Sequence, residues 1–163
     1  MRAVILADTH VPRRARALPP EVLAAVDAAD VVIHAGDWVS RSLVDDLASR
    51  TRLLGCYGNN DGPDIRSVLP EVARETFNGV RVAVVHETGQ SAGRERRMDA
   101  AYGAETDLLV FGHSHIPWDT TTPNGLRLLN PGSPTDKRRQ PVGTWVEATF
   151  ADGRVEVEWR SVG

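Results

Sequence analysis

Five short apolar runs recur along the first two thirds of the chain, and each has the length of a buried strand. They occupy residues 3–7, 31–33, 53–56, 80–85 and 108–111. Their β-branched residues lack the 3.6-residue spacing of an amphipathic helix, which favours strands covered on both faces. Helical patterns separate the runs at residues 20–29, 42–50 and 93–104. This alternation predicts a parallel sheet, and Ser42 with Asp45 predicts a capping box on the second helix.

The last third of the chain shows a different pattern, in which apolar and polar residues alternate. Residues 144–150 and 155–159 alternate on either side of the turn-forming pair Asp152-Gly153, so they predict an antiparallel hairpin. A strand-rich second half after a βαβ first half is compatible with two sheets that pack face to face beneath helices. We therefore expect an α/β fold.

Length and composition narrow the class of protein. A chain of 163 residues with 41% apolar content is expected to form one domain over residues 1–163. A formal net charge of −3 gives no sign of an extended nucleic-acid groove. No segment approaches the roughly 20 apolar residues that span a bilayer, and the first apolar run is too short for a signal peptide. We therefore expect a cytoplasmic protein with no membrane partner.

Each of the five apolar runs is followed within a few residues by a side chain that binds metals well. These side chains are Asp8, His10, Asp37, Asn59, His86, His113 and His115. The carboxyl ends of parallel strands line one crevice, so these residues are expected to converge there. One such residue alone is usually a turn former, but four of the five histidines fall in this set. Because Cys56 is the only cysteine, the set lacks thiolates and fits Mn, Fe, Zn, Ni or Co.

The motifs around these residues resemble a known family. They are, in order, Asp8-x-His10, Gly36-Asp37, Gly58-Asn59-Asn60-Asp61, His86 and Gly112-His113-Ser114-His115. This series resembles the motifs of calcineurin-like metallophosphoesterases. The segment Asn130-Pro131-Gly132-Ser133-Pro134 and the small size resemble the compact bacterial and archaeal phosphodiesterase branch. The resemblance implies a four-layer αββα sandwich, made of two mixed β-sheets flanked by helices.

The resemblance also implies two divalent metal ions, with Mn as the first choice and Fe, Zn, Ni, Co or Mg as alternatives. By this resemblance Asp8, His10 and His115 hold one ion. Asn59, His86 and His113 hold the other, and Asp37 bridges them. A water between two such cations becomes hydroxide near neutral pH and attacks phosphorus. The expected function is therefore divalent-metal-dependent hydrolysis of a small phosphate ester.

The sequence departs from the phosphatase branch of that family at two positions. Asn60 stands where many members carry a histidine, and Ser40 stands where those members carry an aspartate that orients it. Asn60 donates a hydrogen bond but cannot protonate a leaving group, which favours a phosphodiester substrate. Asp61 is a candidate replacement acid, with a turn or helix-capping role as the competing interpretation. His34, just before Ala35-Gly36-Asp37, is expected to hydrogen-bond within the site rather than to bind metal.

Several alternatives stay open on sequence grounds. Glu87, where the family often has glycine, either tunes the site or faces solvent. The cluster Lys137-Arg138-Arg139 either binds a substrate phosphate or forms a solvated loop. The alternative functions are a phosphomonoesterase, a dinucleoside-polyphosphate hydrolase, and a non-catalytic interaction scaffold on the same fold. A homo-oligomer is compatible with all of them.

Overall fold

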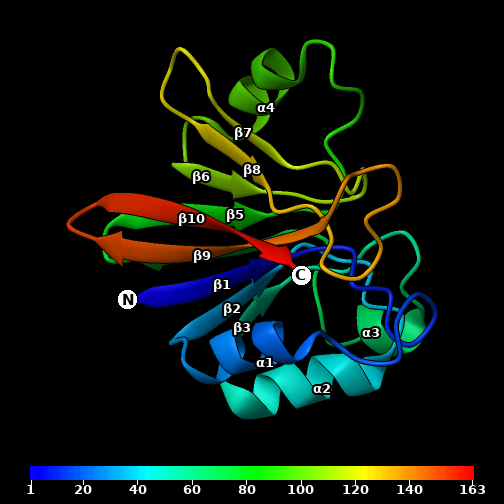
Figure 1. The fold of residues 1–163 in the computed structure, drawn as a ribbon. Coiled ribbons are helices and arrows are strands. Elements are labelled where there is room, and N and C mark those ends of the chain that lie inside the picture. Colours follow the sequence, from blue (N-terminus) through cyan, green and yellow to red (C-terminus); the bar gives the residue numbers. More distant parts are fainter.

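Ten strands form two five-stranded mixed sheets that pack face to face in the computed structural model, which describes residues 1–163 (Figure 1). The first sheet contains, in spatial order, β10 (Arg154–Val162), β9 (Gly143–Ala151), β1 (Arg2–Leu6), β2 (Val31–His34) and β3 (Arg52–Gly55). The second contains β4 (Ala73–Phe77), β5 (Val80–Val84), β6 (Leu108–Val110), β8 (Arg127–Asn130) and β7 (Trp118–Thr121).

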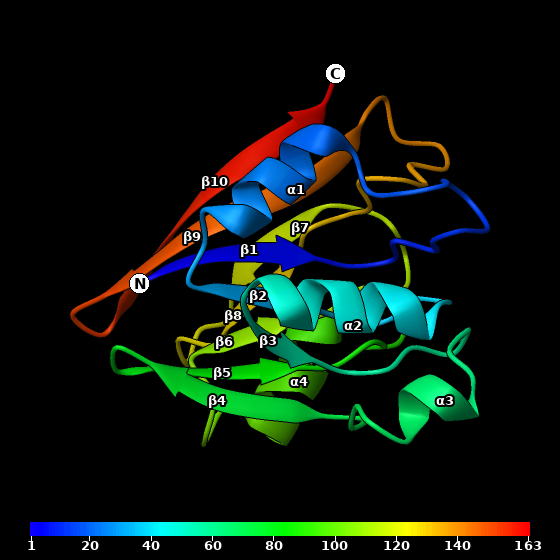
Figure 2. The same cartoon turned by 90° about the horizontal axis from the view of Figure 1, so that it is seen from below.

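Helices cover the outer face of each sheet and complete four layers. Helices α1 (Pro20–Asp27) and α2 (Arg41–Arg50) lie against the first sheet, as Figure 2 shows, and α4 (Arg94–Tyr102) lies against the second. The short helix α3 (Pro63–Arg66) follows the loop after β3. The expected αββα sandwich is therefore confirmed. None of these helices has the length and apolar character needed to cross a membrane.

Three hydrophobic clusters correspond to the three spaces between the layers. A cluster of 19 buried residues fills the space between the sheets, 13 lie beneath α1 and α2, and six lie beneath α4. Successive residues of β1 alternate between two of these clusters, with Ile5 between the sheets and Val4 beneath the helices. This two-sided burial explains why the predicted strands are continuous apolar runs rather than alternating ones.

Parallel pairing brings the carboxyl ends of six strands to one edge of the sandwich. In the first sheet β1, β2 and β3 run parallel, with Leu6 opposite His34 and His34 opposite Gly55. In the second sheet β5, β6 and β8 run parallel, with Val84 opposite Val110. The loops that leave these strands therefore gather on the same side of the molecule, where chain segments from both sheets meet.

The structure differs from the sequence predictions at three strands, one short helix and the start of one helix. Strands β4, β7 and β8 and helix α3 were not expected, because their sequences are short and partly polar. The predicted Ser42–Asp45 capping box is wrong. Helix α2 begins at Arg41, and its N-cap is Ser40, whose side chain accepts a hydrogen bond from the Ser42 amide at 3.2 Å. Asp45 instead pairs with Arg41 one turn away, at 2.9 Å.

Candidate metal centre

The seven candidate metal ligands lie in the loops that leave β1, β2, β3, β5 and β6. Donor atoms of Asp8, His10 and His115 all lie within 4.8 Å of one another. The donor atoms of Asp8, Asp37 and His86 form a second such group. Residues that are more than a hundred positions apart in the sequence are thereby brought into one cluster, in which the first group and the second share the carboxylate of Asp8.

Asp37 lies between histidines that come from different sheets. Its Oδ2 atom is 3.4 Å from the Nε2 atom of His10 and 3.4 Å from the Nε2 atom of His86. The backbone amide of Asn60 donates to Oδ1 at 2.9 Å, and its side-chain amide donates to Oδ2 at 2.7 Å. The carboxylate is therefore held in place by Asn60 while it faces both histidines.

Backbone carbonyls orient two of the histidines. His86 Nδ1 lies 2.7 Å from the carbonyl oxygen of Ala35, and His115 Nδ1 lies 2.6 Å from that of Asp136. A carbonyl only accepts hydrogen bonds, so each Nδ1 carries a proton, and in the neutral ring each Nε2 presents a lone pair to the centre. Metal-binding histidines in proteins are oriented by this kind of hydrogen bond from the other ring nitrogen.

Two buried imidazole nitrogens have no hydrogen-bond partner. They are the Nε2 atoms of His10 and His115, which face Asp37 and Asp8 at 3.4 and 3.5 Å without bonding to them. Leaving a buried polar atom unpaired costs about 1–3 kcal/mol. A divalent cation between these nitrogens and the neighbouring carboxylates would satisfy all of them, so the donor set fits a metal.

Burial and neighbouring charges give the carboxylates of Asp8 and Asp37 different pKa values. Burial raises the pKa of Asp8 to about 7, although the charge of His86 opposes this shift. Burial also disfavours the charged form of Asp37, but hydrogen bonds from His86 and Asn60 outweigh it and hold the pKa of Asp37 well below its usual value. Burial lowers the pKa of His115 to about 4, so its ring is neutral, as a metal ligand requires.

Five of the seven candidate ligands have left-handed backbone conformations. Their φ angles are 54° at Asp8, 44° at His10, 60° at Asp37, 72° at His113 and 61° at His115. Each such conformation costs a non-glycine residue about 1 kcal/mol or more, and such residues cluster at functional sites. The loops thus bend sharply where each strand ends, which turns the ligand side chains inward.

Gly58 is required by the close packing of the loops around Asp37. A Cβ atom at Gly58 would overlap the carboxylate and the backbone nitrogen of Asp37. Any larger residue would therefore displace the carboxylate that faces His10 and His86.

The structure gives His34 and Asp61 hydrogen-bonding surroundings. His34 is fully buried, accepts from the Gly36 amide at 3.1 Å, lies 3.0 Å from Thr9 Oγ1 and stacks on Trp38 at 3.6 Å. Both of its ring nitrogens are thus engaged. Asp61 accepts three backbone hydrogen bonds, from Gly58, Asp37 and Val39, at 2.7, 3.0 and 2.7 Å. Asp61 thereby links the loop that carries Asp37 to the loop that carries Asn59.

The remaining sequence candidates differ in exposure and in their contacts. The His113 Nδ1 atom is 3.1 Å from Asn59 Oδ1, and about half of the His113 side chain is exposed. Glu87 is similarly exposed, with Oε1 3.8 Å from the same nitrogen, and its donor atom groups with those of His86 and His113. Ser40 caps α2. Arg138 lies beside His113, whose carbonyl oxygen is 3.5 Å from Arg138 Nη1.

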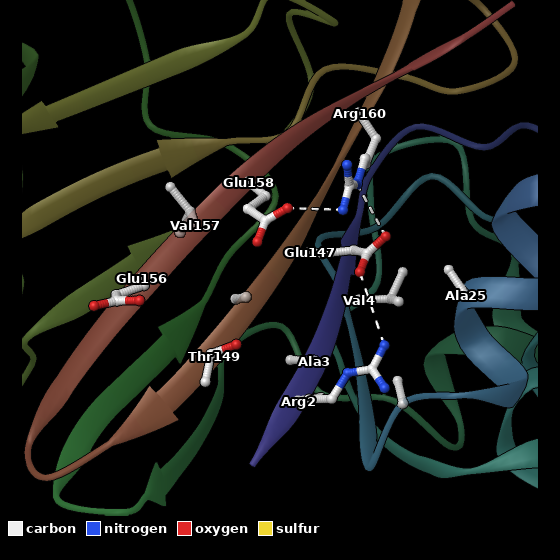
Figure 3. Close-up of a pocket in the computed structure, with 12 residues that line it drawn as sticks. Arg2, Ala3, Val4, Ala25, Glu147, Thr149, Glu156, Val157, Glu158 and Arg160 are labelled. Carbon is white, nitrogen blue, oxygen red and sulfur yellow. Dashed lines mark hydrogen bonds and ion pairs between the residues drawn. The ribbon is translucent and has the colours of Figure 1, made fainter.

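A separate hollow of about 370 Å³ lies at the opposite end of β1, between α1 and the outer face of the first sheet (Figure 3). Four of its five charged side chains form ion pairs with one another. Arg160 pairs with Glu147 at 3.0 Å and with Glu158 at 2.7 Å, and Arg2 approaches Glu147 at 4.0 Å. None of the candidate metal ligands lines this hollow.

Three contacts in the centre were not predicted from the sequence. The carbonyl oxygens of Ala35 and Asp136 orient His86 and His115, and Ser133 donates to the backbone oxygen of Asp8 at 2.8 Å. The segment containing Ser133 was noted for its resemblance to a family motif. A backbone carbonyl has no side-chain signature, so only the folded geometry identifies the other two.

Comparison with known proteins points to one family. Residues 1–153 match the family model for the calcineurin-like phosphoesterase superfamily domain. A probable metallophosphoesterase of Methanocaldococcus jannaschii is 31% identical over 136 residues, which are 82% of this chain and 68% of that protein. A second, from Methanothermobacter thermautotrophicus, is 33% identical over 141 residues, which are 82% of this chain and 77% of the relative.

A solved structure agrees with these relatives. The solution structure of a Thermotoga maritima protein superposes with a TM-score of 0.78 at 30% identity, and 99% of each chain is covered. Its similarity extends over both sheets and their helices. The family match, the sequence relatives and the shared fold have one consequence: this chain belongs to the calcineurin-like phosphoesterase superfamily, to which its probable metallophosphoesterase relatives also point.

Proposed function

We propose that the protein is a phosphodiesterase that depends on two divalent metal ions, with Mn as the first choice. Asp8, His10 and His115 would hold one ion. Asn59, His86 and His113 would hold the other, and Asp37 would bridge them. The observation that carries this proposal is the pair of buried Nε2 atoms, on His10 and His115, that face carboxylates and have no hydrogen-bond partner. When bound, two such cations supply a nucleophilic water near neutral pH and neutralise charge on the phosphate.

The residues of the chain orient the ligands and keep them in the required protonation states. Asn60 fixes the carboxylate of Asp37 and keeps it ionised, and the carbonyls behind His86 and His115 hold their rings with Nε2 toward the centre. The half-exposed His113 leaves that side of the centre open to a substrate.

The preference for diesters follows from how the leaving group is handled. Asn60 has no proton to transfer, and Asp61 is committed to three backbone amides. In such a site the leaving oxygen departs as a stable anion or takes its proton from solvent water. Aryl diesters release a stable phenolate and therefore serve as probes of this site.

A substrate panel tests the proposal. Protein reconstituted with Mn²⁺ is expected to hydrolyse bis(p-nitrophenyl) phosphate with a higher kcat/KM than p-nitrophenyl phosphate or diadenosine tetraphosphate. A higher value on the monoester or on the tetraphosphate would replace the diester assignment with one of those activities. Absence of turnover on every substrate, with each of the candidate metals, would favour a non-catalytic scaffold.

A further inference from the structure

Two loops place six basic residues on one side of the candidate metal centre. The loop after His10 carries three of them, and the loop after Asp136 carries the other three. We call these residues the cationic rim: Arg13, Arg14, Arg16, Lys137, Arg138 and Arg139. They are six of the 19 lysine and arginine residues in a chain whose formal net charge is −3. The rim is therefore a local feature, opposite in sign to the chain as a whole.

Direct contacts join the two loops to each other and to the centre. Arg14 Nε lies 3.4 Å from Asp136 Oδ2, and the hydroxyl of Thr135 donates to the backbone oxygen of Thr9 at 2.6 Å. The carbonyl of Asp136 accepts the hydrogen bond from His115. The rim is thus held against the loops that carry His10 and His115, although its two halves are more than a hundred residues apart in the sequence.

Half of the rim has no partner within the protein. Arg13, Arg16 and Arg139 are exposed, and none of them makes a side-chain hydrogen bond or an ion pair. Elsewhere on the surface most arginines are paired, as Arg81 is with Asp107 and Arg127 with Asp119. Like charges held together without counter-charges attract a polyanion.

A pocket beside the centre has a different character from the rim. A pocket of about 320 Å³ lies beside Asn59 and His86, with Tyr57 and Tyr102 in its wall. The Arg66 guanidinium stacks over the Tyr57 ring at 4.4 Å. Glu71 and Glu87 also line the pocket and outnumber Arg66, so its charge does not favour a second phosphate. Aromatic rings and a guanidinium plane are surfaces on which a nucleobase stacks.

We propose that the substrate is a short single-stranded oligonucleotide, with its phosphates on the cationic rim and a terminal nucleoside in the tyrosine pocket. This rests on the proposed phosphodiesterase function. Hydrolysis consumes one water: the P–O bond to the terminal nucleoside breaks, the phosphate keeps the oxygen of the water, and the nucleoside oxygen takes the proton that this water releases, relayed through solvent. The uncharged nucleoside leaves from the tyrosine pocket, and the shortened, polyanionic strand stays on the cationic rim.

A pair of matched double variants tests the rim. Arg13→Gln/Arg139→Gln removes two unpaired rim charges, and Arg96→Gln/Arg154→Gln removes two exposed charges from α4 and from the far end of β10. The measurement is kcat/KM of the Mn²⁺-loaded enzyme on octathymidylate and on bis(p-nitrophenyl) phosphate, between 50 and 300 mM KCl. For octathymidylate, the slope of log kcat/KM against log salt is expected to become shallower by about 1.4 in the rim variant, because about 0.7 counterion is released per contact with a single strand. The control variant keeps the wild-type slope.

The same assays distinguish failure of this inference from failure of the proposed function. Equal slopes in the two double variants, or wild-type enzyme that cleaves the aryl diester but not octathymidylate, would overturn the oligonucleotide proposal alone. Absence of turnover on both substrates would remove the phosphodiesterase function as well. The pocket is tested by Tyr102→Ala, which is expected to lower kcat/KM on octathymidylate by about fivefold or more, with Tyr102→Phe near wild type. A wild-type kcat/KM of Tyr102→Ala on octathymidylate would rule out binding of the nucleoside in this pocket.

Discussion

Asp37 links the contributions of the two sheets to the candidate centre. It follows β2 of the first sheet, yet its carboxylate faces His86, which follows β5 of the second. His10 approaches the same oxygen from the loop after β1. Asn60 holds this carboxylate in place, so one negative charge lies between the two imidazole rings. If each ring binds a cation, that charge offsets the repulsion between the two cations.

Replacing Asp37 with asparagine keeps the shape of this side chain and removes its charge. We expect Asp37→Asn to bind fewer than two metal ions and to lose at least about 100-fold in kcat on an aryl diester. Elemental analysis of the purified protein and steady-state kinetics measure both effects. Asp45→Asn, on the exposed face of α2, serves as the control. Full metal content and near-normal turnover in Asp37→Asn would refute the bridging role.

Asn60 allows the preference for diesters to be tested directly. Asn60→His introduces a transferable proton at the position where the phosphatase branch carries one, so the ratio of monoester to diester turnover should rise. Asn60→Ala removes the same hydrogen bond to Asp37 and adds no acid. A rise in both variants would assign the effect to the lost hydrogen bond, and no change in Asn60→His would contradict the leaving-group argument.

The protonation of Asp8 and His86 predicts how metal binding depends on pH. In the metal-free protein burial raises the pKa of Asp8 to about 7. Burial alone would lower the pKa of His86, but its hydrogen bond to Asp37 and the nearby carboxylates raise it. Each group must lose its proton to bind a cation, so the apparent metal affinity should rise with pH through about 7. Calorimetric titrations with Mn²⁺ at pH 6, 7 and 8 measure this rise. A pH-independent affinity would contradict the roles of both groups.

Among the secondary-structure elements, helix α2 shows how local polar chemistry sets a boundary. Its first turn is capped by Ser40, at the position where the phosphatase branch has an aspartate that serves its catalytic histidine. In this chain the side chain at position 40 therefore caps a helix. The sequence pattern predicted Ser42 as the cap, and the hydrogen bond from the Ser42 amide to the Ser40 side chain identifies Ser40 instead.

The cap assignment gives a stability prediction. Ser40→Ala should lower the free energy of unfolding by about 1 kcal/mol, because it leaves an amide of the first turn without a partner. Ser42→Ala should change it by about 0.5 kcal/mol or less. Urea denaturation followed by circular dichroism measures both. An equal loss in the two variants would contradict Ser40 as the cap.

The strands show which elements a sequence reveals. The runs buried on both faces were predicted, because their apolar residues are continuous. Strand β4 was missed although Asn78-Gly79, both with positive φ, marks a tight hairpin between it and β5. The same kind of signal, Asp152-Gly153, correctly predicts the hairpin between β9 and β10. The difference lies in the flanking residues: β4 carries Arg74 and Glu75 and has no clear alternation.

At the scale of the whole molecule, the two sheets contribute different parts of the candidate centre. Asp8, His10, Asp37 and Asn59 follow strands of the first sheet, while His86, His113 and His115 follow strands of the second. The strand-end rule predicted that these residues converge. It could not predict the left-handed bends or the carbonyls that orient the rings, because these depend on how loops from the two sheets pack together.

Metal removal should therefore weaken the whole fold. Binding at 100 times the dissociation constant stabilises a folded protein by about 2.7 kcal/mol. For a chain of this size that corresponds to about 5–10 °C in Tm. Calorimetry with and without a chelator measures the shift, and restoring Mn²⁺ should reverse it. An unchanged Tm would indicate that the ions do not stabilise the packing of the two sheets.

The position of the last hairpin affects when the centre can assemble during synthesis. All seven ligand candidates have been translated by His115, but β9, which pairs with β1 and places Val146 and Phe150 between the sheets, begins only at Gly143. A nascent chain thus carries a full set of ligands before the first sheet has its central pairing. Metal capture should be delayed until the final strands emerge, so the ions would arrive at a chain that is already closing around them.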